Sequence, residues 1–154
     1  MNDSGRGGCR TLVVRVQGRA CALPLVNVIE TMRPLPIEPM AGVPAFVCGI
    51  SLVRGAPTPV VDLGALLGTL NGTRTRFVTV RLGDRQVALS VSEVVGIREL
   101  DASTLQKLPP LVQRASGDVI EQIGALDAQV LAVLRAGWEL PEEVWQALTP
   151  GEVA

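Results

Sequence analysis

The residue types that most often perform catalysis are scarce in this chain. Of its 154 residues none is histidine or tyrosine, three are cysteine, and the charged side chains are 15 acidic and 14 basic. Without histidine, neither a Ser-His-Asp nor a Cys-His arrangement can activate a nucleophile, and the commonest metal ligand is missing. No C-x-x-C pair and no glycine-rich phosphate loop takes its place. We therefore expect no catalytic residue, no metal site and no cofactor.

Carboxylates are the remaining candidates for acid–base chemistry. The closest pairs are Glu142 with Glu143, and Asp118 with Glu121. Because Glu142 and Glu143 follow Pro141 at an expected helix start, their charges are explained by the helix dipole. A hydrolase or transferase that uses only Asp, Arg and Ser stays open as a third alternative.

The cysteines and the longest apolar run bear on location. Cys9, Cys21 and Cys48 are too few and too irregularly spaced for a disulfide framework, which favours a reducing compartment. The longest uncharged run, 39–53, is shorter than the roughly 18 to 20 residues that a membrane-spanning helix needs. No apolar stretch typical of a secretory signal is present, and residues 1–10 predict a disordered tail. We expect a cytoplasmic protein without direct membrane insertion.

Charge balance and hydrophobic content limit the class of protein and the partners it can bind. The formal net charge is −1, so we expect no basic surface of the kind that neutralises nucleic-acid phosphates. Hydrophobic residues make up 47% of the chain, which suffices for the core of one compact domain. The sequence predicts a folded domain without a nucleic-acid partner.

A weak internal repeat indicates the framework that must position any site. Residues 11–29 align with 77–95 without gaps, at an offset of 66 positions. Each copy has an alternating run, a short glycine-containing turn and a second apolar run, which is typical of a β-hairpin. The sequence therefore predicts two similar β units. The identical pairs are Val14/Val80, Arg15/Arg81, Arg19/Arg85, Ala22/Ala88, Leu23/Leu89 and Val28/Val94.

The segments between and after the hairpins add short elements. Four prolines in 32–44 predict an extended loop, and 58–61 predict a strand. Asp62 is expected to cap a short helix over 63–67.

The end of the chain predicts one more strand pair and a helix. Residues 118–123 and 129–134 are expected to pair as strands that turn at 127–128. Pro141 opens an amphipathic helix over about 141–148, with apolar side chains on one face.

One stretch of this framework resembles a known family. The segment Gly49-Ile50-Ser51-Leu52-Val53-Arg54-Gly55, followed by Pro59-Val60-Val61-Asp62-Leu63, is similar to a pattern of the CheW family, the adaptors of bacterial chemotaxis. The order of later elements also agrees, so that the resemblance covers about 11–148. Two positions depart from the pattern: Leu52 stands where the family usually has Asn, and Ser92 where it usually has Asp.

The resemblance implies an all-β fold of two five-stranded SH3-like β-barrel subdomains with short helices, including a C-terminal helix. In a single domain over 11–148, subdomain one would cover about 11–70, subdomain two about 76–135, and the closing helix about 141–148. It also implies a non-catalytic adaptor that couples the cytoplasmic signalling tip of a chemoreceptor to the regulatory domain of a CheA-type histidine kinase.

Carried over by position, the receptor-binding groove between the barrels would use Val28, Glu30, Gly49 and Arg54. Val28 would supply an apolar contact and Glu30 a contact at the rim, and Gly49 would let a backbone approach closely. Arg54 would pair with a receptor carboxylate, or would instead fix its own loop by bonding backbone carbonyls or Asp62. No kinase-binding residue is assigned.

A function of another class stays open beside the adaptor. The crevice between the two β subdomains could serve as the pocket of a small-molecule-binding sensor domain, although an aromatic content of 3% leaves few side chains for stacking.

Overall fold

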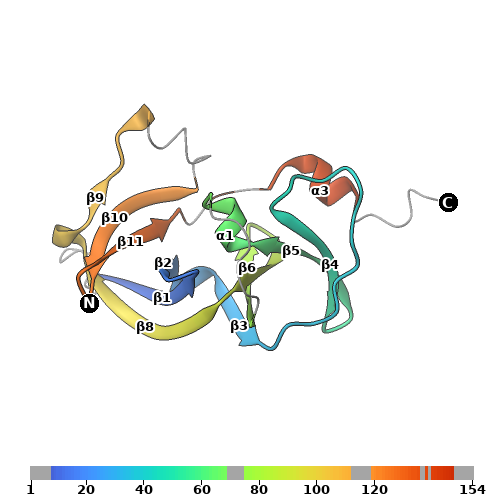
Figure 1. The fold of residues 1–154 in the computed structure, drawn as a ribbon, viewed down its shortest axis with the longest axis horizontal. Coiled ribbons are helices and arrows are strands. Elements are labelled where there is room, and N and C mark those ends of the chain that lie inside the picture. Colours follow the sequence, from blue (N-terminus) through green and yellow to red (C-terminus); the bar gives the residue numbers. More distant parts are fainter. Residues whose placement is uncertain (1–7, 69–74, 112–118, 136–137, 139, 148–154) are drawn as a thin grey trace.

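Strands dominate the computed structural model, which describes residues 8–68, 75–111, 119–135, 138 and 140–147 (Figure 1). They form two curved sheets, and each sheet forms an SH3-like barrel. The expected fold class is confirmed. Sheet A has the spatial order β8 (Glu93–Asp101), β1 (Gly8–Val16), β2 (Arg19–Pro24), β11 (Gln129–Leu134), β10 (Ile120–Leu126), β9 (Gln106–Lys107). Sheet B has the order β3 (Val28–Met32), β6 (Arg76–Leu82), β7 (Arg85–Val91), β5 (Ala56–Asp62), β4 (Val47–Val53).

Short helical segments connect and close the strands: η2 (Leu25–Asn27), α1 (Leu63–Leu66), η3 (Ala102–Thr104) and α3 (Glu142–Ala147). The expected cap of α1 is present, because Oδ1 of Asp62 accepts a hydrogen bond from the backbone N–H of Ala65 at 3.1 Å. The closing helix is confirmed over 142–147. Among the described residues, no helix is long and apolar enough to cross a membrane.

Tight turns join the antiparallel pairs. Arg54 and Gly55, between β4 and β5, both have positive φ, at 51° and 82°. Asp127 and Ala128, between β10 and β11, have φ of 51° and 65°. Two consecutive positive φ values are the mark of the type I′ turn, whose twist matches that of the strands it joins. The strand pair expected around 127–128 is therefore confirmed.

The two repeats exchange strands. After the first hairpin, β3 leaves sheet A and pairs with the second hairpin, so that Val28 lies opposite Val80. After the second hairpin, β8 pairs with the first, so that Val94 lies opposite Val14. Val28 and Val94 are equivalent in the repeat, as are Val14 and Val80, and the exchange is reciprocal. The two barrels are therefore interlocked.

This exchange corrects the expected division of the chain. We expected subdomain one over 11–70 and subdomain two over 76–135, but sheet A takes strands from both stretches and so does sheet B. Alternation of apolar residues defines which face of a strand is buried, and it does not define the strand's partner. Sheet A also contains one more strand than expected, the two-residue β9. Residues 8–10 of the predicted tail belong instead to β1, which begins at Gly8 and pairs with β8, and residues 1–7 lie outside the described residues.

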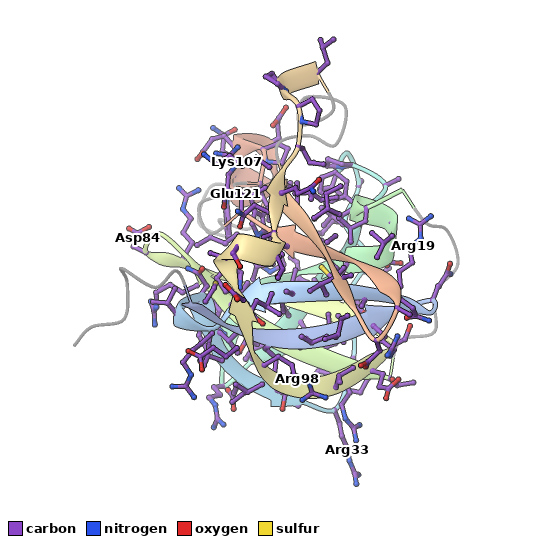
Figure 2. All side chains as sticks on the ribbon, turned by 90° about the vertical axis from the view of Figure 1, so that its left-hand side faces the viewer. Arg19, Arg33, Asp84, Arg98, Lys107 and Glu121 are labelled. Carbon is purple, nitrogen blue, oxygen red and sulfur yellow. The ribbon has the colours of Figure 1, made fainter. Side chains whose placement is uncertain are left out.

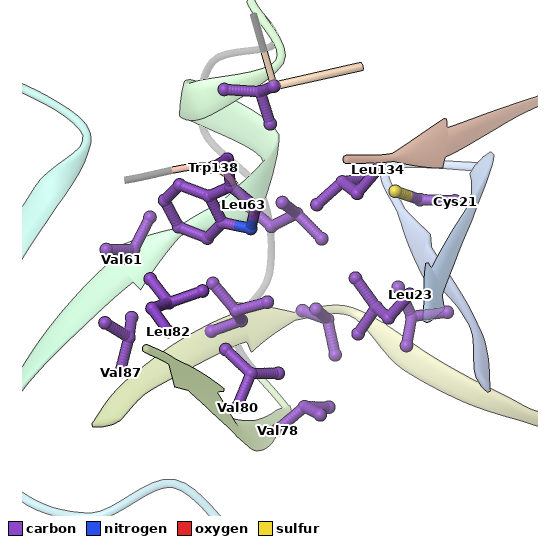
Figure 3. Close-up of a cluster of buried hydrophobic side chains, with 14 of the residues drawn as sticks. Cys21, Leu23, Val61, Leu63, Val78, Val80, Leu82, Val87, Leu134 and Trp138 are labelled. Atoms are coloured by element: carbon purple, nitrogen blue, oxygen red, sulfur yellow. The ribbon is translucent and has the colours of Figure 1, made fainter. Parts of the chain in front are cut away.

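The main hydrophobic core lies between the barrels. Cys21 and Leu23 of sheet A meet Val61, Val80 and other side chains of sheet B, with the Trp138 indole among them (Figure 3). The five named side chains are each at most 6% exposed. Burial raises the pKa of the Cys21 thiol far above its ordinary value, so Cys21 acts as a small apolar side chain. One shared core gives the two barrels a fixed relative position.

Candidate functional site

An exposed ion pair lies on the sheet B barrel. Glu30 is on β3, and Arg54 is the first residue of the β4–β5 turn. The Arg54 guanidinium donates from Nε to Oε2 of Glu30 at 2.8 Å and from Nη2 to Oε1 at 2.7 Å. Because β3 and β4 stand at opposite ends of the strand order in sheet B, this two-bond pair joins the two edges of the barrel.

The turn aims Arg54 at Glu30 at a conformational cost. Its φ of 51° lies in the left-handed region, which costs a non-glycine residue about 1 to 2 kcal/mol. Asn would suit this position better in a type I′ turn before glycine. An arginine here is therefore not explained by the turn itself. A residue held in a sparsely populated conformation points to a role of its side chain.

Each side chain of the pair stabilises the ionised form of the other. Hydrogen bonds from Arg54 hold the pKa of the Glu30 carboxyl below its ordinary value, and Glu30 in turn raises the pKa of Arg54. Both groups are ionised at neutral pH. The Arg54 side chain is 76% exposed, and a guanidinium carries five N–H donors, of which Glu30 takes two. The arrangement can present oriented donors to the surface of another molecule.

Within the chain, Arg54 pairs with Glu30 and not with Asp62, and its contact with a receptor stays a prediction. We expected it to meet a receptor carboxylate, or to bond its own loop or Asp62. Its partner is Glu30, while the Asp62 carboxylate caps α1. The sequence marked Glu30 and Arg54 as separate site residues, and the structure brings them together. Opposite charges 24 residues apart, in the absence of a periodic pattern, gave no signal of this contact.

Val28 and Gly49 contribute mainly to the fold. Val28 is half-buried and packs against the main core. Gly49 is buried, with φ of 147°, and a Cβ added there would lie 2.1 Å from the carbonyl oxygen of Glu38. We expected a backbone to approach Gly49 closely. The backbone that does so is the chain's own proline-rich segment, in which Glu38 pairs with Ile50.

The two positions that depart from the family pattern have different surroundings. Leu52, on β4, is 66% exposed and lies opposite Pro57 of β5. Ser92 lies between β7 of sheet B and β8 of sheet A, where the chain passes from one barrel to the other. Its Oγ accepts a hydrogen bond from the backbone N–H of Gln17 at 3.2 Å, and its N–H donates to the carbonyl of Arg15 at 2.9 Å. Leu52 thus adds an apolar surface on the strand that leads to Arg54, whereas Ser92 supports the first hairpin.

The rest of the described surface contains no cluster of three or more His, Cys, Asp or Glu side chains that could hold a metal. Basic side chains are spread out: Arg19, Arg98 and Lys107 lie at separate places in Figure 2. Dispersed charge of this kind does not form the continuous basic stripe that tracks a phosphate backbone.

Two interlocked SH3-like barrels around one core, with an exposed ion pair as the site, define a double-barrel module suited to contact with another macromolecule. The chain belongs to the CheW family: a model of the CheW-like domain matches residues 10–137.

Known proteins resemble the chain over most of its length. It is 26% identical to "Chemotaxis protein CheW" of Bacillus subtilis over 148 residues, which are 94% of this chain and 95% of that protein. It is 34% identical to "Protein PilI" of Pseudomonas aeruginosa over 101 residues, which are 63% of this chain and 57% of that protein. The crystal structure of the scaffolding protein TtCheW from Thermoanaerobacter tengcongensis has the same fold, with a TM-score of 0.71 and 21% identity, and the match covers 82% of this chain and 88% of that one. Family membership supports the role of a chemotaxis adaptor or scaffold.

Proposed function

We propose that this chain is a non-catalytic adaptor that couples chemoreceptors to a CheA-type histidine kinase in a chemosensory array. The observation that carries the proposal is the exposed Glu30–Arg54 ion pair, set by a strained turn on a barrel of the CheW family. An adaptor needs surfaces that recognise two partners at once, and it needs no reacting group. It would act in the cytoplasm and reach the membrane through its receptor.

The receptor contact would combine one polar and one apolar element. Arg54 has free donors for a carboxylate or carbonyl of the receptor's signalling tip, and Glu30 fixes their direction. Leu52 offers an exposed aliphatic side chain on β4, the strand that leads into the turn with Arg54. Because Gly49 is buried, its part in the contact is to keep the proline-rich segment against β4. Charges at the rim of such a contact tune recognition and association rate more than affinity.

The regulatory domain of the kinase is the proposed second partner. No residue of this chain is assigned to that contact. If one chain serves both partners, the kinase must use a surface that leaves Glu30 and Arg54 accessible. Each partner would then bind with the same affinity whether or not the other partner is bound.

The crevice between the two barrels leaves little room for the ligand of the alternative, a small-molecule sensor. A cavity at the junction of the barrels is lined by Leu23, Val80, Leu89 and Trp138 among others, and its volume is about 10 Å³. That is about the room for one water molecule, whereas ligand pockets measure roughly 300 to 1,000 Å³.

Binding assays with purified partners test the proposal. The chain is titrated with a receptor signalling-tip fragment and, separately, with the regulatory domain of a CheA-type kinase, both from its own genome. We expect saturable binding to each, in the micromolar range of transient assemblies, and a ternary complex when all three are mixed. Absence of binding to every receptor and kinase of that genome would refute the adaptor function.

A further inference from the structure

A second hollow in the sheet B barrel shares no residue with the ion pair. A cavity of about 420 Å³ lies between the β6–β7 turn and the closing helix α3. Figure 1 shows α3 far from β3, the strand that carries Glu30. The cavity is lined by Leu82, Gly83, Asp84, Arg85, Trp138, Leu140, Glu142 and Trp145.

The apolar residues that line this cavity are held in place by the main core. Leu82, Trp138 and Leu140 are 8%, 6% and 5% exposed and belong to the main core. Trp145, on α3, is half-buried against the same core. Trp138 and Trp145 are the only tryptophans of the chain. Tryptophan and arginine are the residue types most enriched at the energetic centres of protein interfaces, and this cavity has both.

The charged side chains of the cavity are only partly satisfied by one another. The Arg85 guanidinium lies over the Trp145 ring, 4.7 Å from its centroid. It also donates from Nη1 and Nη2 to the two carboxylate oxygens of Glu142, at 3.3 and 3.4 Å. These bonds are longer than the 2.7 and 2.8 Å of the Glu30–Arg54 pair. The Arg85 guanidinium therefore interacts with both the Trp145 ring and the Glu142 carboxylate. The Glu142 carboxylate can still accept further hydrogen bonds.

Among the described residues, the cavity is lined by two acidic side chains, Asp84 and Glu142, and one basic side chain, Arg85. The positive charge of Arg85 is already engaged by Glu142 and the Trp145 ring. A cation entering the cavity would meet two acceptors and an aromatic wall. An anion would have to take Arg85 from both of its present partners.

We propose that this cavity is a docking site for an arginine side chain, next to an aliphatic residue, on a partner protein. The aliphatic residue and the methylene stem of the arginine would pack on Leu82, Leu140 and Trp138. The planar guanidinium would donate to Asp84 and Glu142, because its fork of donors matches carboxylates. This site shares no residue with the receptor contact proposed above and does not depend on it.

Tryptophan signals provide a direct test, because both tryptophans line the cavity and the chain has no tyrosine. The probe is the dipeptide acetyl-Leu-Arg-amide, added to ¹⁵N-labelled full-length protein while the two indole N–H resonances and the emission spectrum are followed. The control probe is acetyl-Leu-citrulline-amide, which keeps the shape of arginine and lacks its charge. We expect saturable changes with the arginine probe, and binding of the citrulline probe at least about tenfold weaker, which corresponds to ~1.4 kcal/mol.

A pair of matched substitutions tests the position of the site. Asp84→Asn should weaken binding of the arginine probe severalfold. Asp127→Asn, at the β10–β11 turn of the other barrel, should leave it unchanged. Thermal melts of both variants establish that the fold is intact, and Glu142→Gln replaces Asp84→Asn if the latter does not fold. No indole shift, equal binding of the citrulline probe, or tighter binding of acetyl-Leu-Glu-amide would each overturn the proposal.

Discussion

The Glu30 carboxylate accepts two hydrogen bonds from the Arg54 guanidinium, at 2.8 and 2.7 Å, across the gap between the first and last strands of sheet B. Arg54 makes this contact from a left-handed backbone conformation, which is strained for arginine. Gly55, the next residue, also has positive φ but adopts it without strain because glycine has no Cβ. Turn strain and side-chain pairing therefore act on the same residue, and a substitution can separate them.

Arg54→Asn should uncouple stability from binding. Asn-Gly is the preferred pair for a type I′ turn, so the backbone strain is relieved while the guanidinium is lost. We expect a melting temperature within about 4 °C of the unsubstituted protein, a shift that corresponds to roughly 1 kcal/mol in a domain of this size. Binding of the receptor signalling tip should fall at least about tenfold, which is ~1.4 kcal/mol.

The matched variant for this test is Arg54→Lys, which keeps the charge and lacks the two-bond fork. It should bind the receptor tip with intermediate affinity. If Arg54→Asn bound the tip as well as the unsubstituted protein does, Arg54 would have a purely structural role.

Loss of Glu30 should resemble loss of Arg54, and the two effects should not add. Because Glu30 orients the guanidinium, Glu30→Gln leaves Arg54 present but undirected. We expect weaker receptor binding for Glu30→Gln and a double variant, with Arg54→Asn, no weaker than Arg54→Asn alone. A double-mutant cycle of binding constants, measured by calorimetry, checks this. Fully additive losses would mean that the two side chains contact the receptor independently.

Acid should remove the ion pair within a defined pH window. The pKa of Glu30 is lowered in the folded protein, so its contribution to stability is complete above the ordinary glutamate value of about 4.3. That contribution is lost as the pH falls through the lowered folded value. The difference in melting temperature between the unsubstituted protein and Glu30→Gln should therefore be constant from about pH 7 to pH 5 and disappear in stronger acid. A difference that grew on acidification would contradict the assignment.

Gly49→Ala should destabilise the protein strongly. A Cβ at this position would lie 2.1 Å from the Glu38 carbonyl oxygen, and the φ of 147° is itself unfavourable for alanine. Strain and overpacking each cost roughly 1 to 3 kcal/mol, so we expect a loss of about 2 kcal/mol or more in urea unfolding.

The control for Gly49→Ala is Gly42→Ala, where φ is also positive, at 77°, but no atom lies within 4 Å of an added Cβ. It should lose only about 1 kcal/mol, the cost of the left-handed conformation. Equal losses at the two positions would show that the approach of Glu38 is not tight in solution.

The exchange of β3 and β8 predicts that neither half of the chain folds alone. Cutting after Asn71 leaves β1 and β2 without β8 and β11, and separates β3 from β6. Fragments 1–71 and 72–154 should each lack cooperative unfolding by circular dichroism, and an equimolar mixture should recover the spectrum and the Trp138 emission of the intact chain. A cooperative transition in either isolated fragment would argue against interlocked barrels.

Much of the local structure was predictable because its causes are local. The turn at 127–128, the Asp62 cap and the helix after Pro141 each depend on the conformational preferences of neighbouring residues. The family resemblance indicated Arg54, within the pattern at 49–63, and Glu30, after the first hairpin, only as positions along the chain. It gave no distance between them.

The pairing of strands and the completion of both sites depend on contacts between distant residues. Nothing in the alternation of 77–95 states that Val80 faces Val28 rather than a strand of its own half. Arg85 and Glu142, 57 residues apart, meet only because the chain returns from sheet A to place α3 on sheet B.

The sequence by itself determined that the chain forms two similar β-hairpins and a capped short helix, because short-range preferences suffice for these. It also determined that the chain has no histidine and resembles the CheW family. Only the tertiary structure decided that the hairpins exchange their following strands, that Gly49 accommodates the chain's own backbone, and that Arg54 reaches Glu30. The physical reason is that burial of apolar faces has no direction. Many pairings would satisfy it, and the packed core selects one.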